Sequence, residues 1–167
     1  MLSLFRELYD HMRWADAVVW RAALSHEPAA DDVTLRDRFV HIHMVQRAFL
    51  FVWRGEEQHY PDSFDALRDV ARWGRQYHED VQSHFAALDD AALDRPVILP
   101  WAARLIRRFG REPAPTTMRE TMMQVPMHST YHRGQVNTRL RDLGAEPPLT
   151  DYIAWLWMGK PAAEWPQ

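Results

Sequence analysis

The chain has 167 residues, 47% of them hydrophobic and 26% charged, which is an ordinary composition for a single globular domain spanning residues 1–167. Its net charge of −3 and its lack of a long apolar run or a signal-peptide pattern argue against nucleic acid or membrane as a partner, and favour the cytoplasm. Because the chain has no cysteine, disulfides, thiolate metal sites and cysteine nucleophiles are excluded.

The first predicted element is an amphipathic helix over residues 2–24. Apolar residues recur there at steps of three and four, the spacing of one helix face. The expected buried stripe comprises Leu4, Leu8, Met12, Ala15, Val18, Val19 and Ala22. Asp16 lies off this stripe, and we expect His11 on the helix surface. Trp14 and Trp20 are expected to anchor the core or an interface.

A second helix is predicted over residues 35–54. Gly55 should end it, because glycine readily adopts the left-handed conformation that follows many helices. His41 and His43 lie on this helix on either side of Ile42. Each is turned by about 100° from Ile42 around the helix axis, so periodicity leaves open which of the two histidines points inward.

A third helix is predicted over residues 64–88, followed by a long connection. Gly74 inside this helix costs about 1 kcal/mol relative to alanine, which favours close packing against a neighbouring helix. His78 and His84 are expected to be structural or exposed. The connection, residues 97–116, shows no strand pattern, and we expect it to be a functional loop or to carry a little structure of its own. Its basic residues are Arg104, Arg107, Arg108 and Arg111. They are expected to form a solvated face, with an anionic substrate or a partner subunit as the alternative.

Thr116 or Thr117 is predicted to cap a fourth long helix, which continues to the terminating glycine Gly144. Pro126 lies inside this helix, and because proline removes a backbone hydrogen bond we expect a kink or a bulge there. Gly134 suggests that a neighbouring helix or a ligand approaches the backbone closely.

The fourth helix also carries two histidines four residues apart, His128 and His132. On a helix they stand one above the other on the same face, from where two imidazoles can reach one metal ion. A third histidine from the second helix, His41 or His43, would complete a three-histidine site with an open position. The alternative is that these histidines are polar groups satisfied within the core.

Four long helices with one long connection predict an all-α fold, a four-helix bundle. A short helix over residues 152–158, with Trp155 and Trp157, should follow and pack across the bundle or a dimer partner.

At this point the sequence resembles a known family, the DinB/YfiT-like metalloprotein superfamily of four-helix bundles. The resemblance covers nearly the whole chain. The matching segments are residues 9–15, the end of the second helix at 53–55, the element His-Ser-Thr-Tyr-His-Arg-Gly-Gln at 128–135, and residues 143–153. The element at 128–135 is a much more specific signal than a bare histidine pair.

The resemblance implies a divalent metal ion, with Zn, Ni or Fe as candidates, held by three histidines. His128 and His132 match the two ligands that the family has on its last long helix. Counting back from the glycine that ends the second helix, the third ligand falls on His41, in preference to His43. The position that is usually acidic in the family is Gln46 here, which leaves no carboxylate base at that place.

The resemblance further implies metal-dependent chemistry on a small-molecule substrate, since members include thiol S-transferases and hydrolases. We therefore predict a hydrolase or a thiol S-transferase whose metal ion activates water or a thiol. Gln46, Gln124 and Tyr131 are candidate pocket groups, and no catalytic residue is assigned. Arg133 and Gln135 are candidates for polar contacts behind the ligands or between helices. The alternative is a non-catalytic, stress-related bundle that binds a metal or a small molecule; a homodimer is expected as well.

Overall fold

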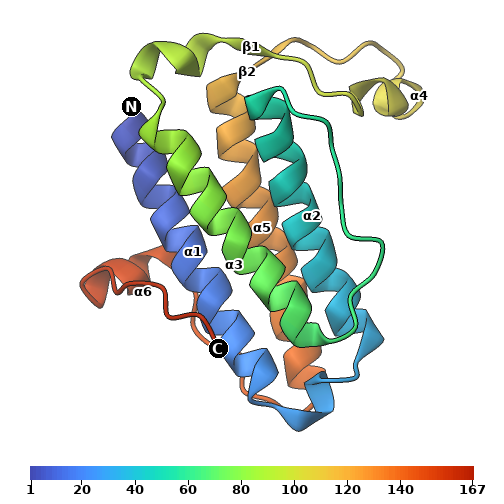
Figure 1. The fold of residues 1–167 in the computed structure, drawn as a ribbon, viewed down its shortest axis with the longest axis vertical. Coiled ribbons are helices and arrows are strands. Elements are labelled where there is room, and N and C mark those ends of the chain that lie inside the picture. The colour runs from blue at the N-terminus through green and yellow to red at the C-terminus, as the bar shows by residue number, and fades with distance from the viewer.

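The computed structural model describes residues 1–167, and its main part consists of four long helices lying side by side (Figure 1). They are α1 (Leu2–Leu24), α2 (Val33–Arg54), α3 (Leu67–Ala86) and α5 (Met118–Asp142). Both α1 and α2 pack against α3 and α5, so the four helices form a closed ring around a shared core. The predicted all-α four-helix bundle is confirmed.

Local sequence signals set the C-terminal ends of α2 and α5 and the start of α5, as predicted, whereas α2 begins at Val33, two residues before the predicted Leu35. Gly55 follows α2 with a φ of +69°, and Gly144 lies just after α5 with a φ of +90°. At the start of α5, the hydroxyl of Thr117 accepts a hydrogen bond from the N–H of Glu120. The carboxylate of Glu120 in turn accepts one from the N–H of Thr117 at 2.7 Å. This reciprocal pair satisfies two N–H groups that the helix itself leaves free.

The start of α3 differs from the prediction, because the helix begins at Leu67 and not at residue 64. The carboxylate of Asp69 accepts a hydrogen bond from the backbone N–H of Ala66 at 3.0 Å. This side chain therefore caps the first turn of α3.

Three further predictions concern residues inside the helices. The ring of His43 on α2 fills the space where a Cβ at Gly74 would stand, so the predicted close packing of α3 at this glycine is confirmed. At Gly134 no protein atom lies within 4 Å of such a Cβ, so the predicted close approach of a neighbouring helix is wrong. Pro126 lies within α5, which is α-helical on both sides of it without a π-helical turn, so no bulge interrupts the helix at this proline.

The connection between α3 and α5 carries a little structure of its own, which is one of the two expectations from the sequence. It contains β1 (Pro96–Val97), the single-turn helix α4 (Ile106–Phe109) and β2 (Thr116–Thr117). The two strands pair antiparallel in a small sheet across one end of the bundle (Figure 1). Strands of two residues are too short to show an alternating pattern, so their positions could not be predicted from the sequence. The four arginines of this connection are exposed, as expected.

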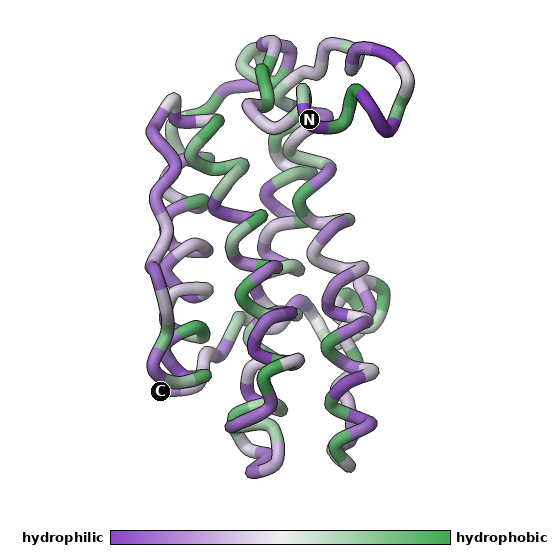
Figure 2. The backbone as a smooth tube through the Cα atoms, turned by 90° about the vertical axis from the view of Figure 1, so that its right-hand side faces the viewer, coloured by the Kyte–Doolittle hydropathy of each residue, from purple (hydrophilic) through white to green (hydrophobic).

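The apolar side of each helix faces the bundle interior, and hydrophobic and hydrophilic residues alternate along each helix in Figure 2. The buried side chains form two main clusters. The first includes Phe5, Tyr9, Met12, Trp53, Tyr77 and Met122. The second includes Trp20, Leu35, Phe39, Ile42, Val136 and Leu140.

The buried face of α1 differs from the predicted stripe. Leu4 is 51% exposed, and Phe5 and Tyr9 are buried on the side that faces the core. Asp16, predicted to lie off the stripe, is only 3% exposed, because α3 and α5 supply partners for its charge. His11 is also buried, and its Nε2 lies 3.0 Å from the carbonyl oxygen of Thr150.

The chain ends with the short helix α6 (Tyr152–Trp157) and an extended tail that lies beside α1 (Figure 1). Trp155 packs against Trp14 of α1, as expected for a C-terminal segment that crosses the bundle. None of the helices combines the length and the apolar character that crossing a bilayer requires.

Candidate metal centre

Three histidines come together where α2 packs against α5. His41 comes from α2, and His128 and His132 lie one turn apart on α5. One ring nitrogen from each histidine lies within 4.8 Å of the other two. The ring centroid of His41 is 5.2 Å from that of His128 and 4.4 Å from that of His132, and the two α5 rings are 4.3 Å apart. Two segments far apart in the sequence thus form one compact cluster of nitrogen donors.

His43, the alternative third ligand, lies elsewhere and has no free lone pair. Its Nε2 accepts a hydrogen bond from the indole N–H of Trp20 at 2.9 Å. Because an indole can only donate, the proton of this imidazole sits on Nδ1, which donates to Oε1 of Gln46 at 2.8 Å. Both nitrogens of His43 are therefore occupied within the core, where the side chain is 1% exposed.

Two of the three histidines, His41 and His128, have lowered pKa values, which favour the neutral form that ligates metals. Burial, together with the neighbouring His132, lowers the pKa of His41. Burial and the other two histidines lower the pKa of His128 to about 4. At neutral pH both rings therefore carry a lone pair on one nitrogen.

The orientation of His132 is fixed by Gln135, one turn further along α5. The two side chains meet at 2.9 Å between Nδ1 and Oε1. Because an amide oxygen only accepts, Nδ1 carries the proton and Nε2 keeps its lone pair. The predicted role of Gln135 as a polar contact to a ligand residue is confirmed. His128 presents a buried Nδ1 that has no hydrogen-bond partner in the protein.

The cluster opens into a pocket of about 370 Å³ between α2 and α5. It is lined by Thr34, Asp37, Arg38, His41, His132 and Gln135, none of which is hydrophobic. No further histidine, aspartate or glutamate joins the three-histidine group, so its solvent side is not closed by the protein. Sequence reasoning missed Asp37 and Arg38, although both stand one helical turn before His41 and share its face.

Of the other predicted pocket groups, Gln46 and Gln124 lie apart from the cluster and Tyr131 lies beside it. Gln46 is fully buried in the core. Gln124 is exposed and lines a different pocket, next to Phe49 and Trp101. Tyr131 is 66% exposed, with its ring centroid 5.0 Å from that of His132, so it lies beside the cluster on the outer surface.

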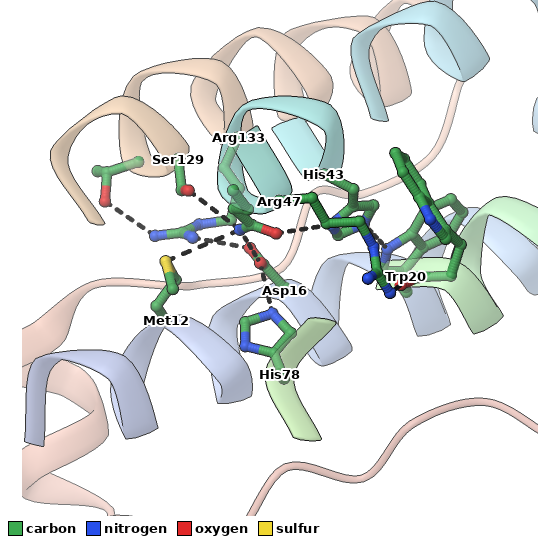
Figure 3. A network of polar contacts seen from close by, with 11 residues as sticks. Met12, Asp16, Trp20, His43, Arg47, His78, Ser129 and Arg133 are labelled. Carbon is green, nitrogen blue, oxygen red and sulfur yellow. Dashed lines mark hydrogen bonds and ion pairs between the residues drawn. The ribbon is translucent and has the colours of Figure 1, made fainter. Parts of the chain in front are cut away.

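A buried polar network lies on the inner side of α5 (Figure 3). At its centre the carboxylate of Asp16 accepts from Arg133 at 2.8 Å, from His78 at 3.0 Å and from the amide of Gln46 at 2.9 Å. Burial alone would raise the pKa of Asp16, but Arg133 and His78 outweigh this effect and hold the pKa well below its usual range. Burial lowers the pKa of His78, so its imidazole is neutral. The network ties all four long helices together, and the predicted inter-helix contact of Arg133 is confirmed.

Two comparisons with known proteins bear on the identity of the chain. A comparison with curated proteins finds no match. The family model described as DinB family matches residues 1–164 of the 167. The chain therefore belongs to the DinB family.

Proposed function

We propose that His41, His128 and His132 bind one divalent metal ion and that the protein uses it as a hydrolase or a thiol S-transferase. The observation that carries this proposal is the convergence of three imidazoles from two helices, with ring nitrogens within 4.8 Å of one another. Three protein ligands with an open position are typical of catalytic metal sites, whereas structural sites are closed by a fourth protein ligand.

The residues present fit such an ion. His128 has a buried Nδ1 without a protein partner, and His132 keeps a lone pair on Nε2 because its Nδ1 is bonded to Gln135. Imidazole nitrogens suit Zn, Ni and Fe alike, so the set does not select one of these metals. When bound, the ion would supply a Lewis acid that lowers the pKa of water or of a substrate thiol toward neutrality.

The protein's own groups would then position the substrate and take up the released proton. The polar pocket beside the histidines offers the hydroxyl of Thr34 and the exposed carboxylate of Asp37. Asp37 stands one turn from His41 and is the carboxylate in this pocket, so it is the candidate proton acceptor. The amide of Gln46 cannot accept a proton in this way. The predicted homodimer, the cytoplasmic location and the small-molecule substrate remain part of this proposal.

The first experiment measures the metal content of protein purified without a histidine tag. The wild type should contain close to one metal ion per chain, and His41→Ala and His132→Ala should lose it. His43→Ala is the matched control, because it removes an imidazole from the same helix outside the cluster. Circular dichroism would confirm that each variant is folded.

Metal-loaded protein is then assayed with ester substrates and with thiols plus an electrophile. Turnover by the wild type but not by His132→Ala would support catalysis. A wild type that contains no metal and binds no Zn²⁺ or Ni²⁺ on titration would refute the metal site. A wild type that binds metal but converts no substrate would favour a non-catalytic metal-binding bundle.

A further inference from the structure

The pocket beside the three histidines contains one arginine, Arg38, that forms no ion pair. It lies on α2 three residues before His41, on the same helix face, and both residues line the pocket together with His132. We propose that Arg38 binds an anionic group of the substrate, a carboxylate or a phosphate, next to the metal centre. This inference rests on the proposed function and names the class of substrate: a small polar anion.

Arg38 is held in place by the residue that also orients a histidine of the cluster. Its Nη1 donates to the backbone carbonyl of Gln135 at 2.5 Å. The side chain of the same Gln135 accepts from Nδ1 of His132. The guanidinium and the imidazole therefore have a common support on α5, which fixes the position of the cation relative to the ligand nitrogens.

The remaining donors of Arg38 are available to a ligand. No carboxylate of the protein pairs with this guanidinium. Its Nε and Nη2 make no hydrogen bond to the protein and are not among the buried polar atoms that lack a partner, so both reach solvent. These two nitrogens lie on one edge of the planar group and form the fork that matches two oxygens of a carboxylate or a phosphate.

The charge of the site favours an anion. Three imidazole side chains bring no negative charge to compensate a divalent ion. Arg38 adds one positive charge and Asp37 one negative charge, so the occupied pocket stays net positive. Because no lining residue is hydrophobic, the pocket also offers nothing to a substrate that is mainly apolar.

The test measures anion binding by titration calorimetry on metal-free and Zn²⁺-loaded protein. The probes are acetate, inorganic phosphate and acetamide, which has the shape of acetate without its charge. Arg38→Gln removes the fork and Arg38→Lys keeps only a point charge. Arg36→Gln is the matched control, because Arg36 lies on the same helix, turned by about 200° from Arg38 and outside the pocket. The metal content of every variant is measured in parallel.

We expect acetate or phosphate to bind the wild type, and acetamide not to bind. Arg38→Gln should weaken the anion about tenfold, Arg38→Lys should retain part of the affinity, and Arg36→Gln should match the wild type. The stronger of the two anions then identifies the substrate group. Equal anion affinity in Arg38→Gln and the wild type, at equal metal content, would overturn the inference while leaving the metal site intact. A wild-type protein that binds no metal would instead refute the proposed function.

Discussion

Replacing Gly74 by alanine would test how tightly α3 packs against α2. An added Cβ would stand 2.7 Å from Cδ2 of His43 and still closer to Nε2 and Cε1 of the same ring. The ring cannot swing aside freely, because its two nitrogens are bonded to Trp20 and Gln46. The substitution therefore forces either the helices apart or the ring out of its hydrogen bonds.

The expected cost follows from these contacts. Overpacking of a filled core costs about 1–3 kcal/mol. A buried indole N–H of Trp20 that loses its acceptor costs about 1–3 kcal/mol more. Alanine returns about 1 kcal/mol through its higher helix propensity. These terms together give about 1–5 kcal/mol, so we expect Gly74→Ala to lower the free energy of unfolding by about 3 kcal/mol, which in a domain of this size lowers the Tm on the order of 10 °C.

The matched control is Gly134→Ala, because nothing lies within 4 Å of a Cβ at that position of α5. It should raise the free energy of unfolding by about 0.5–1 kcal/mol. Urea and thermal unfolding followed by circular dichroism would measure both variants. In the double variant with His43→Ala, most of the additional cost of Gly74→Ala should disappear. A Gly74→Ala protein as stable as Gly134→Ala would refute the packing argument.

Three further predictions concern the polar groups. Asp16→Asn leaves Arg133 buried without a counter-charge, so the free energy of unfolding measured in urea should fall by about 3–5 kcal/mol. Adding Arg133→Met should restore much of this stability. A single variant as stable as the wild type would contradict the prediction. His78 is neutral when folded, because burial lowers its pKa, but binds a proton when the chain unfolds below pH 6.5. Stability should therefore decrease as the pH falls below about 6.5, by up to about 1.4 kcal/mol per pH unit for this group, and a His78→Gln protein with the wild-type slope would argue against it. Gln135→Leu removes the acceptor that orients His132, so the metal affinity should fall about 10–100-fold. Competition with a chelator measures this affinity. An unchanged affinity would show that Gln135 does not support His132 as a ligand.

The sequence by itself determined the helices and most of their ends. Apolar spacing indicated four long helices, and residues such as Gly55, Thr117 and Gly144 marked where they begin and end. These signals are local, since a cap or a left-handed glycine depends on residues within one turn. The pair His128 and His132 was equally readable, because residues four apart share a face on any helix.

The tertiary structure decided which residues those faces meet. His41 and His43 are equivalent by periodicity, and only the packing of α2 between α3 and α5 brings His41 to the cluster and His43 to Trp20. Asp16 was predicted to lie off the buried stripe of its helix, but in the structure it is buried because α5 supplies Arg133 as its partner. The physical reason is that a helix fixes the angles between its own side chains, whereas the environment on each side is set by other helices far away in the chain.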